Sequence, residues 1–389
     1  MKRSWIVLMA VLLTLGMVAL PSTMDVHASK AEKNGDYVPG EVIVKFKSGA
    51  SKGKMRSAHQ DAEAKVVSEN KEVGFQVVKV KEQSVKEAVK EYQANPNVEY
   101  AEPNTIFKAM DVPNDPDFSK QWGLETVKAP AAWDVTTGSK DVKVAIVDTG
   151  VDYEHEDLKG KVELGGDYID HDDDPMDENG HGTHCAGIAA ASTNNGVGIA
   201  GMAPDVTIYA VRVLDANGSG TLDAVANGIT DAADAGAEVI SLSLGASQGG
   251  QALQEAVQYA DSKGSFVVAA AGNDGSTSPN YPAYYDEVMA VAATDSNDQK
   301  AYFSNYGSWV DVAAPGVDIY ATYPNGKYES LSGTSMATPH VAGLGGLLAS
   351  QGKKGAEIRS TIEKTSDEIS GTGSDWKYGR INAQAAVSQ

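Results

Sequence analysis

The sequence contains almost no cysteine, little basic charge and, after its first residues, no long apolar run. Its single cysteine, Cys185, excludes an internal disulfide and with it the disulfide-rich secreted folds. After Trp5–Leu20 no segment is apolar enough to cross a bilayer. The 389 residues carry 32 Lys and Arg against 53 Asp and Glu, a net charge of −21. Such acidity argues against a nucleic-acid partner, because phosphate binding needs a basic surface.

The first residues have the pattern of a secretory signal. Two basic residues precede the apolar run Trp5–Leu20, and Val26-His27-Ala28 offers small residues at the −3 and −1 positions of a cleavage site. We expect a signal peptide over residues 1–28, a secreted product, and no membrane association once the signal is removed. A membrane anchor is the alternative, although the apolar run is short for a span.

Charge divides the chain near residue 110. Residues 1–110 carry 16 basic and 13 acidic side chains, a net of +3, whereas residues 111–389 carry 16 and 40, a net of −24. A polar stretch with Pro113 and Pro116 marks the boundary. Residues 29–110 indicate a small α+β unit, with strands expected at Glu41–Phe46, Phe75–Val80 and Val98–Ala101 and helices at Lys52–Lys65 and Ser84–Gln93.

Strands and helices alternate from residue 142 onward. Apolar runs rich in Val and Ile predict strands at Val142–Val147, Val206–Leu214, Glu238–Leu244, Ser265–Ala271, Glu287–Ala293 and Val310–Ala313. Helical patterns lie between several of them, at Gly182–Ala191, Leu222–Ala235, Gln251–Lys263 and Pro339–Ala349. This alternation predicts an α/β fold, in which a parallel sheet is covered by helices on both faces.

Three residues at element ends form a candidate catalytic set. Asp148 closes the first of these strands, His181 opens a helix of small residues, and Ser335 precedes another helix. A nucleophilic serine needs a base, and the base needs a carboxylate that fixes its tautomer. Each residue alone has an ordinary explanation, as a turn, a helix start or a cap. Their joint occurrence, at spacings of 33 and 154 residues, favours nucleophilic catalysis.

The motifs around these residues resemble the subtilisin-like serine proteases. Asp148-Thr-Gly, His181-Gly-Thr-His and Gly-Thr-Ser335-Met-Ala carry the resemblance, which covers nearly the whole chain. Cys185, four residues after the histidine, matches the cysteine-containing, thermitase-like branch. The resemblance implies that Asp148 orients His181, that His181 is general base and then general acid, and that Ser335 attacks the scissile carbonyl. It also implies a subtilisin-like sheet preceded by a ferredoxin-like prodomain.

The same resemblance implies an oxyanion hole and a substrate cleft. Asn273 would donate to the oxyanion together with the backbone N–H of Ser335. The residues of the two cleft walls would be Ser243, Leu244 and Gly245 on one side and Ala270 and Gly272 on the other. These small, uncharged residues predict a broad apolar S1 pocket, although Ala246 stands where a second glycine is common.

Residues 29–110 would then be an inhibitory propeptide, and residues 111–389 the peptidase. The resemblance places the maturation cut near Met110–Asp111, with Met110 at P1 and Phe107 at P4. The side chains of Met110 and Phe107 are both apolar, in agreement with the apolar pocket predicted for the substrate. The expected partners are therefore protein and peptide substrates and the chain's own propeptide, and we expect a monomer.

Cys185 lies one helical turn after His181, among Gly and Ala residues. A thiol near a histidine could be a nucleophile or a metal ligand, but a buried free cysteine is usually an inert packing residue. His181, His184 and Cys185 do not converge well as a zinc site, and no further ligand cluster follows. We therefore expect Cys185 to be a packing residue.

Alternating carboxylates in Asp167–Met176 suggest a hard cation with oxygen ligands. An EF-hand is excluded, because Pro175 and His181 would stand where Gly and Glu are required. A solvated acidic loop is the alternative. The resemblance implies structural Ca²⁺ at two to three sites, which we name A, B and C. Their ligands would be Asp115, Asp157, Ser192, Asn195, Val197 and Ile199 for site A; Asp167, Asp172, Asp174 and Met176 for site B; and Ala283, Tyr285, Val288 and Asp311 for site C.

These ligands would not all bind through their side chains. Ser192, Val197 and Ile199 of site A, and the first three residues of site C, would bind through backbone carbonyls. Met176 could contribute only its carbonyl. Site C would suit a monovalent ion as well.

Two other function classes remain to be weighed. A catalytically inactive binding module on the same fold is disfavoured, because all four catalytic positions are intact. An acidic carboxyl-type peptidase would need a glutamate at His181 and an aspartate at Asn273, and neither is present.

Overall fold

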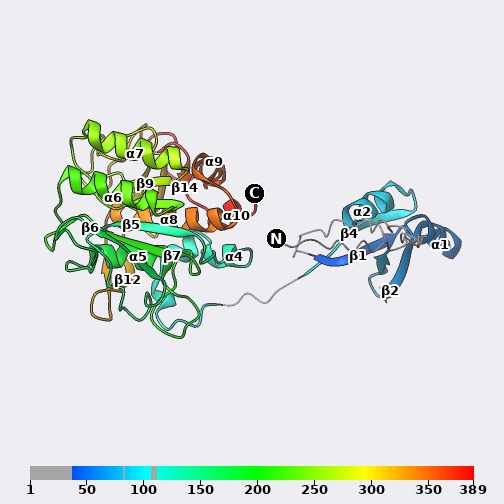
Figure 1. Cartoon of the computed structure of the whole chain (residues 1–389). Coiled ribbons are helices and arrows are strands. Elements are labelled where there is room, and N and C mark those ends of the chain that lie inside the picture. The colour runs from blue at the N-terminus through cyan, green and yellow to red at the C-terminus, as the bar shows by residue number, and fades with distance from the viewer. Residues whose placement is uncertain (1–36, 82–83, 107–111) are drawn as a thin grey trace, which may run out of the picture. The chain divides into compact units, whose positions relative to one another are not determined.

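The structure is a computed structural model in which residues 37–81, 84–106 and 112–389 are described. It divides into two compact units, residues 1–109 and residues 110–389 (Figure 1). The expected signal peptide and the expected cut at Met110–Asp111 lie outside the described residues. Among the described residues, no helix is both long and apolar enough to cross a membrane.

The N-terminal unit is a four-stranded antiparallel sheet with two helices. Its elements are β1 (Tyr37–Phe46), α1 (Lys52–Asp61), β2 (Ala64–Asn70), β3 (Phe75–Val80), α2 (Val85–Ala94) and β4 (Val98–Thr105). The βαββαβ order and the sheet order β2-β3-β1-β4 are those of a ferredoxin-like fold. His59 Nδ1 of α1 lies 2.9 Å from the Tyr92 hydroxyl of α2, which places the two helices side by side. The expected α+β architecture is therefore confirmed.

Two boundaries in this unit show how local sequence sets an element. Ser84 caps α2 and forms a capping box with Glu87, as its sequence predicts. The helix expected over Lys52–Lys65 instead ends at Asp61, because Glu63 adopts a left-handed backbone (φ 45°) and β2 begins at Ala64. Strand β2 was not among the expected strands.

The C-terminal unit contains an eight-stranded parallel sheet in the order β14-β11-β10-β9-β8-β5-β7-β6. Its strands are β5 (Lys143–Asp148), β6 (Val162–Asp167), β7 (Thr207–Arg212), β8 (Val239–Leu242), β9 (Phe266–Ala270), β10 (Met289–Thr294), β11 (Val312–Pro315) and β14 (Gly379–Arg380). A separate antiparallel hairpin joins β12 (Ile319–Tyr323) to β13 (Lys327–Leu331). The expected parallel sheet is confirmed, although β6, β14 and the hairpin were not predicted.

Helices cover both faces of this sheet (Figure 1). They are α3 (Trp122–Thr126), α4 (Ala129–Trp133), α5 (His181–Ala190), α6 (Leu222–Asp234), α7 (Gln251–Lys263), α8 (Thr334–Ser350), α9 (Gly355–Thr365) and α10 (Ala383–Val387), with a short 3₁₀ turn at Phe118–Lys120. One apolar core contains residues of α5 and α8, and a second contains residues of α6 and α7. Burial on both faces explains why β5, β8 and β9 are almost wholly apolar.

Helix α8 begins at Thr334, five residues before the expected start at Pro339. Proline has no backbone N–H, so inside a helix it frees the carbonyl four residues earlier, which here belongs to Ser335. Ser335 lies in the first turn of α8, and its carbonyl has to find a donor outside the helix.

The β12–β13 hairpin lies along α5, the helix that begins with His181. The Thr322 hydroxyl donates to the Thr183 carbonyl at 2.7 Å, and His184 Nε2 lies 3.0 Å from the Glu329 carbonyl. Both strands of the hairpin are thus bonded to the first turn of α5.

Candidate active site

The ends of three adjacent strands meet at the candidate site. Strand β5 pairs with β8, and β8 pairs with β9, all in parallel. Asp148 is the last residue of β5, Ser243 follows β8, and Asn273 lies three residues after β9. Ligands bind beyond the carboxyl ends of such strands, where these side chains are now gathered.

Asp148 and His181 form a short ion-pair contact. His181 Nδ1 lies 2.7 Å from Asp148 Oδ1, which also accepts from the Thr149 backbone N–H at 2.8 Å. The Asp148 side chain is buried, and its Oδ2 has no hydrogen-bond partner among the residues that the structure describes. Because the carboxylate accepts a hydrogen bond from Nδ1–H, neutral His181 presents Nε2 as an unprotonated acceptor.

Burial alone would lower the pKa of His181. The attraction and hydrogen bond from Asp148, with a smaller contribution from Asp177, outweigh burial and raise that pKa above its usual value. A raised pKa makes the imidazole a stronger proton acceptor, as a general base requires.

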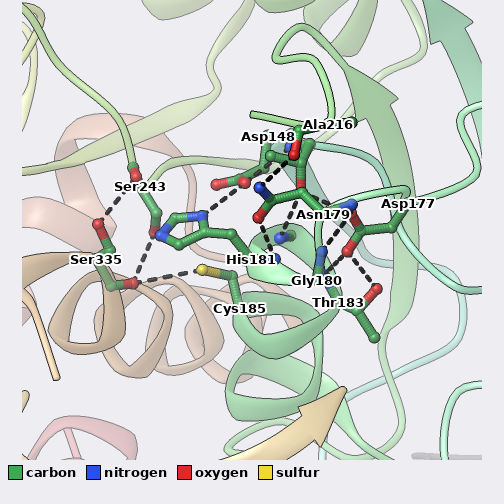
Figure 2. Close-up of polar contacts among 12 residues, drawn as sticks. Asp148, Asp177, Asn179, Gly180, His181, Thr183, Cys185, Ala216, Ser243 and Ser335 are labelled. Atoms are coloured by element: carbon green, nitrogen blue, oxygen red, sulfur yellow. Dashed lines mark hydrogen bonds and ion pairs between the residues drawn. The ribbon is translucent and has the colours of Figure 1, made fainter. Parts of the chain in front are cut away.

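Ser335 is paired with Ser243 in both directions (Figure 2). The Ser335 hydroxyl donates to the Ser243 carbonyl at 3.0 Å, and the Ser243 hydroxyl donates to the Ser335 carbonyl at 2.9 Å. The Cys185 thiol approaches that same carbonyl at 3.4 Å, so the oxygen freed by Pro339 has two donors. The proton of the Ser335 hydroxyl is thereby committed to Ser243 rather than to His181.

Asn273 and the first turn of α8 bring two donors together. Asn273 Oδ1 accepts from both the backbone N–H and the hydroxyl of Thr334, each at 2.9 Å. Its Nδ2 is therefore left as a donor. A Cβ placed on Gly333 would lie 3.6 Å from both Asn273 Nδ2 and the backbone nitrogen of Ser335. The two groups thus flank one small space, which suits a developing oxyanion.

A cavity of about 580 Å³ adjoins His181. Ser243, Leu244 and Gly245 line it, as do apolar side chains that include Leu214, Leu222, Val225, Leu253 and Tyr281. A peptide side chain could be buried there, beside the imidazole.

Comparison with known proteins decides the family. Residues 139–380 match the subtilase family, and residues 23–104 match the fervidolysin N-terminal prodomain. The chain belongs to the subtilase family. It is similar to a thermophilic serine proteinase of Bacillus sp. (strain AK1), with 54% identity over 95% of this chain and 92% of that protein. It is also similar to thermitase of Thermoactinomyces vulgaris, with 64% identity over 71% of this chain and 99% of that protein. The chain is thus a subtilisin-like serine endopeptidase, close to thermitase.

In this subtilase the two expected cleft walls meet at a residue that the sequence analysis missed. Asn280 Nδ2 donates to the Ala270 carbonyl at 3.1 Å. A Cβ on Gly245 would lie only 2.2 Å from Asn280 Nδ2, and one on Gly272 would lie 3.2 Å from its side-chain carbon. Asn280 therefore lies between the walls. No signal in its Ser-Pro-Asn-Tyr context indicated this position.

The residues of site A are brought together. The backbone N–H of Asn195 donates to Asp115 at 3.1 Å, and its side-chain amide donates to Asp157 at 2.8 Å. Both carboxylates are buried, and burial raises the pKa of Asp157 despite its hydrogen bonds, which include one from the Tyr328 hydroxyl. No ion pair of the described residues includes either carboxylate. This set of oxygen donors fits a hard cation.

Sites B and C place basic side chains where a cation was expected. At site B, Asp167 Oδ2 is 2.8 Å from the buried Arg212, and its Oδ1 accepts from the N–H of Ile169. Asp172 does bond with Asp167 through the backbone, but its side chain is exposed.

At site C, the four expected ligands line one cavity of about 290 Å³. Asp311 there is paired with Lys377 at 2.8 Å through Oδ1 and with Arg359 at 3.0 Å through Oδ2. Both carboxylate oxygens of Asp311 are therefore already neutralised by side chains of the chain itself.

Proposed function

We propose that this subtilase hydrolyses peptide bonds with Ser335 as nucleophile, His181 as base and acid, and Asp148 as the residue that orients His181. The observation that carries the proposal is the 2.7 Å contact between Asp148 Oδ1 and His181 Nδ1 at the mouth of a lined cleft. This contact leaves Nε2 as the atom that accepts the serine proton.

The resting position of Ser335 defines the first step. Rotation about its Cα–Cβ bond turns the hydroxyl from the Ser243 carbonyl toward His181 Nε2, which takes the hydroxyl proton as Oγ attacks the scissile carbonyl. The Asp148 carboxylate stabilises the imidazolium that forms. Asn273 Nδ2 and the backbone N–H of Ser335 then donate to the oxyanion. His181 returns its proton to the leaving amine, and a water repeats the sequence to release the acyl group.

Substrate selection would follow from the cleft. Ser243, Leu244 and Gly245 would pair with the substrate backbone and, with Ala270 and Gly272, enclose an apolar P1 side chain. Asn280 would limit the depth of that pocket. The apolar side chains around the 580 Å³ cavity support an apolar P4 preference.

We further propose that the chain is made as a secreted preproenzyme, with a signal peptide at 1–28, a propeptide at 29–110 and the mature enzyme at 111–389. The match of residues 23–104 to a fervidolysin prodomain supports a propeptide that acts as intramolecular inhibitor. Ser335 would remove it by cutting after Met110, and the mature enzyme would act as a monomer on protein substrates.

We limit the calcium proposal to site A. Ca²⁺ there would neutralise two buried carboxylates, Asp115 and Asp157, and fix the loop at residues 192–199. Sites B and C do not fit a cation in this arrangement, because Arg212 and Lys377 hold their buried carboxylates. Faster thermal inactivation in EDTA is expected for the wild type and not for Asp157→Asn, which lacks one site A carboxylate. Equal inactivation of the wild type with and without EDTA would refute the proposal.

Ser335→Ala tests the catalytic proposal. The variant should fold with an unchanged circular dichroism spectrum, keep its propeptide uncut and cleave no peptide substrate above background. The matched control is Ser332→Ala, three residues earlier, which should mature normally. Maturation of purified Ser335→Ala would show that another group is the nucleophile. It would also exclude the alternative of a catalytically inactive binding module.

A further inference from the structure

The helix that carries His181 has no cap of its own. Its N-cap residue is Gly180, which has a left-handed backbone (φ 113°) and no side chain to accept a hydrogen bond. The first four N–H groups of a helix have no partner within it and need one elsewhere. Position 181 is the first of these, and its N–H donates to Asn179 Oδ1 at 3.1 Å, so any looseness at this end would move the imidazole directly.

Asp177, four residues before the helix, bonds the N–H of Thr183 in this first turn and the backbone of the two residues that precede the helix. Its Oδ1 accepts from the backbone N–H groups of Asn179 and Gly180 at 2.9 and 2.8 Å. Its Oδ2 accepts from the backbone N–H and the hydroxyl of Thr183 at 2.9 and 2.6 Å. The side chain is buried, and none of the ion pairs of the described residues includes it. Figure 2 shows the contacts of this side chain with Gly180 and Thr183 at the start of the helix.

The same carboxylate is joined to the strand that carries Asp148. The Thr149 hydroxyl donates to Asp177 Oδ1 at 2.8 Å and accepts from the Gly182 backbone N–H at 2.9 Å. Thr149 is the next residue after Asp148. The bonds therefore close a ring from β5, through Thr149 and Asp177, to the first turn of α5 and back through the contact between His181 and Asp148.

We propose that Asp177 is a positioning residue of the reaction, which fixes His181 relative to Asp148 and adds a second negative charge behind the imidazole. The inference rests on the proposed catalytic role of His181. Asp177 touches neither substrate nor reacting atoms, so it acts through His181 alone. A misplacement of a catalytic group by about 1 Å can reduce turnover on the order of 100-fold.

The charges around His181 predict a change in the pH dependence of the rate that helix capping alone would not cause. Asp148 faces the imidazole from β5 and Asp177 from the preceding loop, while His184 and Cys185 lie on α5 itself. Burial lowers the pKa of His181, and the two carboxylates raise it, Asp148 more than Asp177. Removal of the Asp177 charge should therefore lower that pKa, so that the acid limb of the rate profile moves to lower pH.

The test compares Asp177→Asn with Glu178→Gln. Both substitutions remove one negative charge, but Glu178 is exposed and bonds Arg212 instead of α5. We expect Asp177→Asn to lower kcat about 10- to 100-fold with KM nearly unchanged, and to move the acid limb of kcat to lower pH. Glu178→Gln should match the wild type in kcat, in KM and in the position of the acid limb. An Asp177→Asn enzyme with wild-type kcat and acid limb would overturn the inference.

A second pair of variants covers the case in which Asp177→Asn does not fold. Thr149→Val removes the hydroxyl bridge at constant volume, and Thr149→Ser retains it. Loss of kcat in Thr149→Val with recovery in Thr149→Ser supports the inference, and equal kcat in the two refutes it. These outcomes are separate from the catalytic proposal itself, which fails only if Ser335→Ala remains active.

Discussion

The hydroxyl of Ser335 rests on the backbone carbonyl of Ser243, and the hydroxyl of Ser243 bonds the carbonyl of Ser335 in return. The second bond exists because Pro339 cannot donate to the Ser335 carbonyl within α8. A proline inside an apolar helix thus creates an acceptor that only a neighbouring strand end can satisfy. Ser335, the proposed nucleophile, is thereby held at its backbone carbonyl, and a single hydrogen bond to Ser243 holds its hydroxyl.

Loss of the Ser243 hydroxyl should lower activity. In Ser243→Ala the Ser335 carbonyl keeps only the Cys185 thiol, a weak donor. One hydrogen bond contributes about 1 kcal/mol, so we expect kcat/KM to fall about fivefold in a peptide hydrolysis assay. Ser241→Ala is the control, because that buried hydroxyl on β8 has no hydrogen-bond partner in the described part of the chain. Equal losses in the two variants would show that the bond to Ser335 has no role.

A methyl group at Gly333 should obstruct the oxyanion. The residue is extended (φ 166°), so alanine introduces no backbone strain. The new Cβ would lie 3.6 Å from both Asn273 Nδ2 and the Ser335 nitrogen, which is ordinary contact for the protein but occupies the space between the donors. Gly333→Ala should lower kcat about 100-fold and leave the unfolding temperature nearly unchanged. A fully active variant would place the oxyanion elsewhere.

Removal of Lys377 should create a cation requirement at site C. In the wild type Lys377 and Arg359 share the Asp311 carboxylate. Lys377→Ala leaves one oxygen of a buried carboxylate facing a cavity of about 290 Å³. The measurement keeps Ca²⁺ saturating and the ionic strength constant, and replaces choline in the buffer by Na⁺ or K⁺. This replacement should raise the unfolding temperature of Lys377→Ala but not of the wild type or Lys377→Arg. The proposal about site C would be wrong if the wild type responded equally.

His340 should make stability depend on pH. Burial lowers the pKa of His340 to about 4, against a hydrogen bond to the Met336 carbonyl that raises it. Because the unfolded chain binds this proton near pH 6.5, the stabilising effect of the neutral side chain is complete above that pH and is lost as pH falls toward 4.

Denaturant unfolding between pH 4.5 and 7.5, in a Ser335→Ala background that prevents autolysis, measures this effect. His340→Leu should reduce the slope of unfolding free energy against pH by up to ~1.4 kcal/mol per pH unit. An unchanged slope in His340→Leu would mean that His340 does not titrate on unfolding.

The sequence was sufficient where the signal is local. Asp148, His181 and Ser335 were singled out as candidates because each stands at the end of an apolar or small-residue element, and the structure places the first two in contact. The same apolar runs predicted the parallel sheet. The start of α8 was misplaced because proline usually marks a boundary, whereas here Ser243 and Cys185 satisfy the carbonyl that it frees.

Features that depend on distant pairing could not be predicted. Asp177 is one carboxylate in an acidic run, and nothing local distinguishes it from its exposed neighbours. Likewise, Arg212 is 45 residues from Asp167 and Lys377 is 66 residues from Asp311, so their ion pairs appear only in the folded chain. Strand β13 of the hairpin is largely polar and exposed, and β12 has only five residues, so neither gives a clear periodicity.

The hairpin also couples two parts of the molecule. Adjacent residues of β13 make the contacts: the Tyr328 hydroxyl bonds Asp157 of site A, and the Glu329 carbonyl bonds His184, one turn after His181. Detachment of this strand would loosen α5 while the eight-stranded sheet stays intact, because local opening needs less free energy than global unfolding. Heat inactivation of this peptidase would then be a local event, visible as early hydrogen exchange in β13 and α5, and reversible until the loosened segment is itself cut.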